Sequence, residues 1–600
     1  MNFFEQQQRS RRDVRRMAFF YALAVIAVVL VVNIVLDVAW RWGFPEIYGA
    51  RVPGALYAWG VGATLVLVLG ATAYHVARLR KGGDAIARLV GARRVLPDTR
   101  DTLERRLLNV VEEMAIAAGT RVPAVYVMPE EPGINAFAAG FDLSNSTITV
   151  TRGTVQTLNR EELAGVIGHE FSHIVRGDVR LNLRMMGVLG GLLAVGLPGK
   201  LLARLIKAVL SRQREFLADA ASVQFTRNPV AIAGALDQLR VSTSGTRIVN
   251  RYAENLSHMF FGQGVAAWAG LALDSHPPLE ERIRRVLPNF GAAEYRARRR
   301  GANADPMTAT VRMAAIDGKR AGDQAQPWSR SLEQSVALVG ALEADKVDYA
   351  QRLMGNIPSV VRDAVRKPAT APAAVLALML AGPPEVMARQ LEAARESGAS
   401  GLAEGAGALL AQRISIAPEL QLTVVDLAIP TLKSISAEAR RELLAALEAV
   451  IQADRRVSPH AFVILALLRS QLTAAATPKA AKSIPGMRTE ALLILSLIVH
   501  AKRGAGANAD SVVENAFRAG ARELAMPDAS MLARDKLTFQ ECGAALDRMR
   551  ALAPLAKAGI VRALFAAVIA GGKIRISEAE LMRLVGASLD CPVPPLFEAL

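Results

Sequence analysis

Residues 161–173 read Glu-Glu-Leu-Ala-Gly-Val-Ile-Gly-His-Glu-Phe-Ser-His, and the last five form an H-E-x-x-H motif. A helix places His169 and His173 one turn apart on one face, where two imidazoles can bind one zinc ion. Glu170 lies beside the first histidine, where it can serve as general base on a metal-bound water. The chain has only 7 His in 600 residues, so a chance match is rare and the motif favours a metal site.

Local signals predict that the motif lies on a helix. Asn159 can cap the helix, and Glu162 three residues later completes a capping box. Gly177 is a suitable stop after Arg176. The sequence therefore predicts a helix of about five turns.

A catalytic zinc site normally has three protein ligands and a water. The best third candidate is Glu215, in the stretch Arg-Glu-Phe-Leu-Ala-Asp at 214–219. Asp219 lies four residues later on the same helix face and could orient a ligand imidazole by a hydrogen bond. The alternative for both carboxylates is an ordinary solvated helix face.

The chain resembles the membrane-bound zinc metallopeptidases that include the heat-shock protease HtpX and the CAAX prenyl endopeptidase. Four segments carry the resemblance in order: Ile-Asn-Ala-Phe-Ala-Ala-Gly (134–140), the motif itself, the stretch 214–219, and Ser-His-Pro-Pro-Leu-Glu-Glu-Arg-Ile (275–283). The resemblance implies an α+β zincin-like domain, with one Zn²⁺ per chain held by His169, His173 and Glu215. It implies that Glu170 activates water and that Asp219 orients a histidine.

The resemblance also implies roles for residues outside the ligand set. Asn135, Ala136 and Phe137 would belong to an edge strand that pairs with extended substrate, a mode that reads backbone more than side chains. His276 would lie near the metal, to stabilise the oxyanion or occupy the open position, or it is a turn histidine ahead of two prolines. Arg282 would anchor that segment by ion pairing.

Two apolar stretches predict a membrane anchor within residues 1–80. Residues 17–36 contain Asn33 as their strongly polar member, and residues 55–73 contain no charge. Each is long enough to cross about 30 Å of hydrocarbon as a helix. They account for part of the 52% hydrophobic fraction and the mean hydropathy of +0.24.

Positive charge predicts the topology. Five arginines precede the first span and six basic residues follow the second, whereas the loop between them holds two. Basic segments stay on the cytoplasmic side, so we expect a multi-pass protein of the bacterial inner membrane whose catalytic domain (81–300) faces the cytoplasm. A third apolar stretch near 185–210 is short for a span. The resemblance suggests a hydrophobic hairpin there. It could enter the bilayer, lie on its surface or pack against protein, and we favour a membrane-associated hairpin.

The formal net charge of +17 has three interpretations. Attraction to the anionic lipid bilayer explains it for an anchored protein. A solvated basic surface is the second. Nucleic acid is the third and is disfavoured, because no nucleic-acid motif accompanies the charge. The two cysteines, Cys542 and Cys591, make neither a disulfide framework nor a zinc cluster.

The second half of the chain has a different character. Residues 301–330 are typical of a linker, and residues 331–600 have helical periodicity and few strand signals. Two stretches, 453–458 and 571–578, share a sequence pattern that is similar to that of the helix-turn-helix units of TerB-like domains. The acidic residues of such units are mostly absent, so we expect no metal there and interpret the region as an all-α domain that docks a protein partner or a substrate.

The fold class is therefore mainly α: transmembrane helices, a metallopeptidase domain with a small edge sheet, and a helical C-terminal domain. The function favoured is a zinc endopeptidase that acts on proteins or peptides, with misfolded membrane proteins as the substrates that the resemblance implies. The alternative is a catalytically idle membrane scaffold or sensor, against which the complete ligand and base set argues. A transporter is disfavoured because most of the chain lies outside the two spans.

Overall fold

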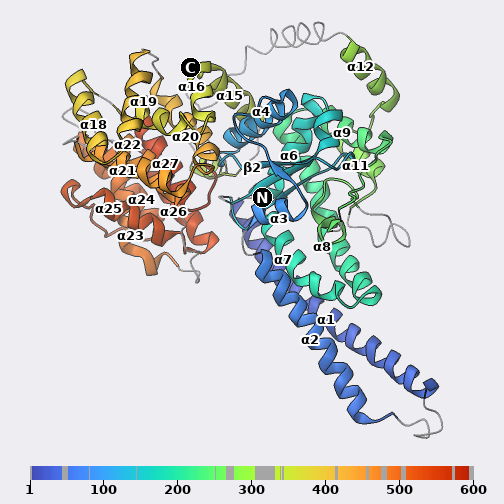
Figure 1. Ribbon diagram of the computed structural model, residues 1–600. Coiled ribbons are helices and arrows are strands. Elements are labelled where there is room, and N and C mark those ends of the chain that lie inside the picture. The colour runs from blue at the N-terminus through green and yellow to red at the C-terminus, as the bar shows by residue number, and fades with distance from the viewer. Residues whose placement is uncertain are drawn as a thin grey trace. The chain divides into compact units, whose positions relative to one another are not determined.

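The chain divides into two units in the computed structural model (Figure 1), and each is described by itself. The sheet unit comprises Gln6–Val95 and Ala124–Gly301, and the helical unit comprises Leu96–Pro123 and Ala302–Leu600 together with Met1–Glu5. The structure describes residues 3–43, 52–79, 82–143, 145–250, 252–264, 276–304 and 332–593, with gaps in the last range at 338, 341–343, 381, 413–415, 454–458, 474–482, 502–508 and 571–573.

A mixed sheet forms the base of the site. Its strand order is β1-β2-β4-β3, with β2 parallel to β4 and the other neighbours antiparallel. β4 reads Thr-Ile-Thr-Val-Thr, a β-branched run that suits a pleated surface. The strands are β1 (Arg93–Arg94), β2 (Ala124–Met128), β3 (Ala136–Ala139) and β4 (Thr147–Thr151).

The predicted helix carrying the H-E-x-x-H motif is confirmed as α6 (Arg160–Arg176), which packs against β3. Asn159 accepts from the Glu162 backbone N–H while the Glu162 carboxylate accepts from Asn159 N–H, so the capping box is complete. Gly177 ends the helix with a φ of 76°, a conformation that favours glycine. The cap and the stop both come from the residues that the sequence indicated.

A helical hairpin follows α6. α7 (Asp178–Leu193) and α8 (Leu197–Thr226) are joined through Gly196, whose φ is 78°. The hairpin expected near 185–210 is therefore built from two helices, and its second arm continues without a break through Glu215 and Asp219. One helix thus supplies both the return of the hairpin and the carboxylates of the site.

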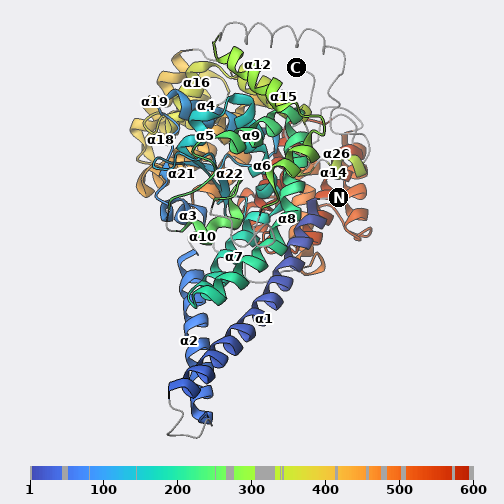
Figure 2. The same cartoon turned by 90° about the vertical axis from the view of Figure 1, so that its right-hand side faces the viewer.

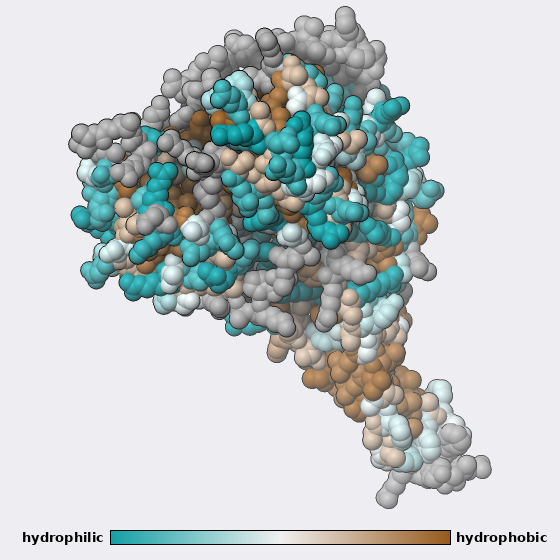
Figure 3. Space-filling model, turned by 60° about the vertical axis from the view of Figure 1, so that its left-hand side comes forward, coloured by the Kyte–Doolittle hydropathy of each residue, from teal (hydrophilic) through white to brown (hydrophobic). Residues whose placement is uncertain are grey.

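Two N-terminal helices are long and apolar enough to cross a membrane. They are α1 (Phe3–Gly43) and α2 (Gly54–Leu79), and the spans within them are Asp13–Gly43 and Gly54–Leu79. Many of their large apolar side chains are exposed, and a hydrophobic surface covers this part of the sheet unit in Figure 3. Figure 2 shows α1 running beside the hairpin, where Met17, Val28 and their neighbours pack on Leu181, Leu189 and Ile206.

Further helices complete the sheet unit. A core of Tyr126, Phe137, Leu183, Met186 and Phe260 joins the strands to α7. The remaining helices of the unit are α3 (Gly83–Leu89), α5 (Arg152–Thr157), α9 (Pro229–Val241), α10 (Ala253–Leu256), η1 (Ser257–Met259), α11 (Leu279–Val286) and α12 (Ala292–Ala304). Among them, α3, α5 and η1 contact the strands.

The helical unit contains helices and no strand among its described residues. Its first helix, α4 (Thr102–Ala117), comes from the range that the sequence assigned to the catalytic domain, and it packs with α15 (Ala344–Asn356). This division places α4 in the helical unit, and the predicted domain ranges stay predictions. The other helices are α14 (Leu332–Ala337), α16 (Ser359–Arg366), α17 (Ala371–Met379), α18 (Pro384–Glu396), α19 (Ser400–Ala411), α20 (Pro418–Leu432), α21 (Ala437–Ala453), α22 (Pro459–Leu472), η3 (Pro485–Met487), α23 (Arg488–Ala501), α24 (Ala509–Glu523), η4 (Arg534–Lys536), α25 (Phe539–Met549), α26 (Pro554–Ala570) and α27 (Ile576–Ser588).

Three predictions fall partly or wholly outside the described residues. Residues 44–51, in the loop between the two spans, are outside the described residues. So are residues 305–330, which form most of the expected linker. The two stretches with the TerB-like sequence pattern are outside them in part, at 454–458 and 571–573.

Candidate metal centre

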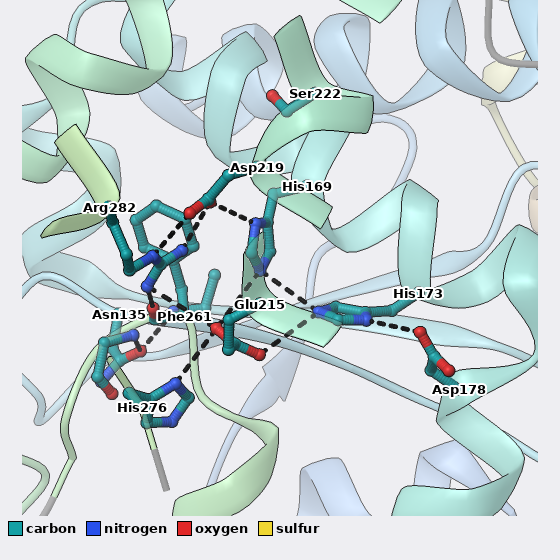
Figure 4. A network of polar contacts seen from close by, with 12 residues as sticks. Asn135, His169, His173, Asp178, Glu215, Asp219, Ser222, Phe261, His276 and Arg282 are labelled. Carbon is teal, nitrogen blue, oxygen red and sulfur yellow. Dashed lines mark hydrogen bonds and ion pairs between the residues drawn. The ribbon is translucent and has the colours of Figure 1, made fainter. Parts of the chain in front are cut away.

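Three buried side chains from two helices converge at one point (Figure 4). His169 and His173 come from α6 and Glu215 from α8, and their candidate ligand atoms all lie within 4.8 Å of one another. The two Nε2 atoms are 3.2 Å apart, and the Glu215 oxygens lie 3.8 Å from His169 Nε2 and 3.7 Å from His173 Nε2. The three residues predicted as ligands are therefore brought together.

The donor set suits a divalent cation. Ligand atoms about 2.0–2.2 Å from one tetrahedral ion lie about 3.3–3.5 Å from each other, close to the spacing here. Two histidines and one glutamate are the protein ligands of many catalytic zinc sites, which keep a fourth position open. The cluster thus fits a zinc-like ion held by three protein ligands.

Asp219 and Arg282 fix the first histidine. Asp219 Oδ1 lies 3.0 Å from His169 Nδ1, which leaves Nε2 directed at the cluster. Arg282 donates to both oxygens of Asp219, at 2.8 and 2.7 Å, and its side chain is fully buried. Burial lowers the pKa of His169 to about 4 despite the nearby Asp219 carboxylate, so the ring is neutral, as a metal ligand must be.

Asp178 fixes the second histidine and was missed by sequence reasoning. Its Oδ2 lies 3.1 Å from His173 Nδ1, at the start of α7 just beyond Gly177. Burial lowers the pKa of His173, but the hydrogen bond and charge of Asp178 outweigh it and raise the pKa above its ordinary value. The available signal was an acidic residue directly after the glycine that ends the helix. Its role could not be predicted, because the sequence does not show in which direction the turn at Gly177 places the Asp178 side chain.

Glu170 is the unpaired acid of the site. It is 1% exposed, and among the described residues neither carboxylate oxygen has a hydrogen-bond partner. Burial raises its pKa to about 8, and the lowering effect of the charge of His173 is smaller. A buried carboxyl group without a partner, beside three candidate ligands, is suited to hold a water molecule and its proton.

His276 contacts Glu215 and leaves neither ring nitrogen free. Nδ1 lies 3.1 Å from Glu215 Oε2, and Nε2 lies 2.8 Å from the carbonyl oxygen of Ser257. Burial would raise the pKa of Glu215, but His276 and the charge of Arg282 lower it to about 2. The contacts seen support Glu215, while the expected role of His276 at the oxyanion stays a prediction.

The predicted substrate strand is β3, the last strand in the sheet order. The Asn135 side chain donates to the carbonyls of Thr246 and Gly262 and accepts from the N–H of Gly262 and of Ala136. Phe261 N–H donates to the Ala136 carbonyl at 2.8 Å. Asn135 and Ala136 are thus already engaged with the chain segment beside them, so any pairing with substrate falls further along the strand.

Two aromatic side chains help to shape the site. Phe137 points into the core and packs edge-on against Phe260. Phe261 packs edge-on against His169, with ring centroids 4.9 Å apart, and the Arg282 guanidinium lies 4.8 Å from the centre of its ring. Sequence reasoning missed Phe261, because nothing in its neighbourhood along the chain marks it as part of the site.

Comparisons with known proteins agree with this geometry. The model of Peptidase family M48 matches residues 101–288. A "Protease HtpX homolog" of Dictyoglomus turgidum is 36% identical over 221 residues, which cover 30% of this chain and 68% of the relative. Homologues with the same name from Thermoanaerobacter pseudethanolicus and Streptococcus pyogenes are 32% and 31% identical over 270 and 266 residues, each covering 38% of this chain and 86% of the relative. The chain therefore belongs to peptidase family M48, as an HtpX-like metalloprotease.

Proposed function

We propose that the chain is a membrane-anchored, zinc-dependent endopeptidase in which His169, His173 and Glu215 hold one Zn²⁺. The observation that supports this most is the convergence of two imidazoles and a carboxylate beside the unpaired acid Glu170. When bound, zinc supplies a Lewis acid that polarises the scissile carbonyl and makes water more acidic.

The chain's own residues perform the proton transfers. Glu170 accepts a proton from the attacking water and returns it to the leaving amine. The buried site excludes bulk water, so a proton held on Glu170 stays available for the leaving group. Asp219 and Asp178 hold the two imidazoles in one tautomer and one orientation, and Arg282 anchors Asp219.

Substrate would bind as an extended strand along the free part of β3. Ala138 lies near Glu170 and is the position where a paired strand would present its carbonyl to the site. Backbone pairing gives loose sequence preference, which suits unfolded chains. Misfolded membrane proteins are the proposed substrates, because α1 and α2 would hold the site near the bilayer of the bacterial inner membrane, on its cytoplasmic face.

Two further assignments support this placement. The α7–α8 hairpin packs along α2 and α1, so we place it against the spans and in contact with the bilayer. We infer that the helical unit, which contains the TerB-like sequence pattern, docks a protein partner.

The test replaces Glu170 with glutamine in the full chain in detergent or lipid discs. Glu170→Gln keeps shape and removes the base, so we expect cleavage of an unfolded membrane protein to fall at least about 100-fold with zinc content unchanged. Glu161→Gln, the same replacement at an exposed position on α6, is the control and should retain activity. Equal cleavage by Glu170→Gln would remove the proposed base. A wild type that binds no zinc would favour the scaffold alternative.

A further inference from the structure

One acidic residue in the N-terminal arginine cluster has a partner in the site. Asp13 is the only acid between residues 6 and 36, and four arginines lie within three positions of it. Positive charge before a span explains the arginines but gives no reason for Asp13. In the structure its Oδ2 accepts from Arg214 Nη2 of α8 at 2.6 Å.

Arg214 connects this residue to the second candidate ligand. Its Nε lies 3.7 Å from Asp178 Oδ1, and the other oxygen of Asp178 lies 3.1 Å from His173 Nδ1. Arg214 is 13% exposed at its side chain and Asp178 is 12% exposed, so solvent screens their ion pair weakly. A continuous polar path therefore runs from α1 through α8 and α7 to α6.

Apolar packing next to this path holds α1 against α7 and α8, so that Asp13 stays close to Arg214. Met17, one turn beyond Asp13, is buried and belongs to the cluster that joins α1 to α7 and α8. Asp13 can reach Arg214 only while α1 lies in this groove. The position of Arg214 therefore depends on whether α1 is packed against α7 and α8.

We propose that Asp13 is a positioning residue for the metal site: by holding Arg214 it fixes Asp178, which fixes the His173 imidazole, so metal affinity depends on the docking of α1. This inference rests on the proposed zinc site. It follows from the shape of arginine, whose planar fork can contact two carboxylates at once. Without Asp13, Arg214 is free to rotate, and Asp178 loses the partner that sets its orientation.

The experiment measures metal affinity of the full chain in lipid discs by competition with a chelator, together with the visible spectrum of the Co²⁺ form. Asp13→Asn should weaken binding by about 3- to 10-fold and alter the Co²⁺ spectrum, a coupling of the usual size between remote groups. Asp178→Asn should weaken binding by about 10- to 100-fold. Because the path runs through Asp178, adding Asp13→Asn to the Asp178→Asn protein should not weaken metal binding any further.

Matched variants separate the outcomes. Asp37→Asn, the same change at the other end of α1, should leave affinity and spectrum unchanged. Asp13→Glu should restore binding in part, and Arg214→Lys should reproduce Asp13→Asn, because a lysine amine cannot span both carboxylates. If Asp13→Asn fails to fold, Arg214→Lys decides the question.

The results that would overturn the proposal are specific. The first is an unchanged metal affinity and Co²⁺ spectrum in Asp13→Asn or Arg214→Lys. The second is an equal loss of metal affinity when Asp13→Asn is introduced into the wild-type protein and into the Asp178→Asn protein. If Glu215→Ala leaves affinity intact, the zinc site itself is wrong. If Glu215→Ala abolishes binding and Asp13→Asn has no effect, the proposed function stands and this inference alone fails.

Discussion

The polar groups of the site form two similar chains. His169 contacts Asp219, which accepts two hydrogen bonds from Arg282, and His173 contacts Asp178, which pairs with Arg214. Each imidazole thus has a carboxylate behind it, and each carboxylate has an arginine. A buried carboxylate needs such a partner, because an unpaired buried charge is strongly destabilising.

We expect His258 to make the stability of the sheet unit depend on pH. Its Nε2 donates to the Asn182 carbonyl, and its buried Nδ1 has no partner among the described residues. Burial lowers its pKa to about 3, and the charges of Lys207, His276 and Arg214 act in the same direction. A proton on Nδ1 would be a buried charge without an acceptor.

The folded pKa of His258 lies below the unfolded value of 6.5, so the unfolded chain binds the proton first. Its contribution is therefore complete above pH 6.5 and is lost as pH falls toward the folded value. Between pH 6.5 and 5 the loss is on the order of 2 kcal/mol. We expect His258→Gln to show a shallower fall in unfolding temperature over this range, in metal-saturated protein whose ligand imidazoles stay neutral. Parallel curves for the two proteins would contradict this.

At the scale of elements, close approach between helices depends on glycine. A Cβ at Gly191 of α7 would lie 2.0 Å from Thr72 Oγ1 and 2.4 Å from the Val68 carbonyl oxygen of α2. Small residues of this kind let helices pack closely in membranes. The close contact between α2 and α7 therefore requires a residue without a side chain at position 191.

Gly191→Ala should push α7 away from α2. The added methyl meets backbone, which cannot move aside, so we expect a loss of about 1–3 kcal/mol and a lower unfolding temperature in detergent. Gly70→Ala on α2 is the matched control, because a Cβ there has no atom within 4 Å. An equal effect of the two substitutions would show that helix propensity, and not packing, decides the result.

Elements with local signals could be predicted from the sequence, and contacts between distant segments could not. α6 was fixed by Asn159, Glu162 and Gly177, and the two apolar helices by their length and composition. Glu215 was proposed because the motif requires a third ligand and the family resemblance includes its segment, and Asp219 because four-residue spacing places it on the same helix face. Asp178 and Phe261 were missed, because their roles depend on a turn and on a loop whose paths no short pattern encodes.

At the scale of the whole molecule, three segments that are separate in the sequence form the helical unit. Leu96–Pro123 belongs to that unit although it lies within the range matched by the family model, apart from its first five residues. Its helix α4 contributes Glu112, which pairs with Arg366 of α16, and both side chains are buried. The helical unit is therefore assembled from three separate parts of the sequence, of which Met1–Glu5 is the shortest, and the composition of 331–600 alone could not reveal this.

Arg366→Ala should destabilise the helical unit. It leaves Glu112 buried without its charge partner, and such losses are about 3–5 kcal/mol. Arg366→Ala combined with Glu112→Gln should recover part of this, because the stranded charge is gone. Thermal or denaturant unfolding of the full chain measures both, with the exposed Arg395→Ala as control. If the double variant is no more stable than the single one, the ion pair is not the cause.

The unbroken course of α8 has a mechanical consequence. From Leu197 at the hairpin turn to Glu215 the helix rises about 27 Å, and no glycine kink or internal proline after its first turn divides it. A rod of this kind transmits a push along its length instead of absorbing it. With the turn in contact with the bilayer as proposed, a thinner or thicker bilayer would displace it and shift Glu215, the candidate ligand, so we expect the lipid surroundings to change the metal affinity of the site.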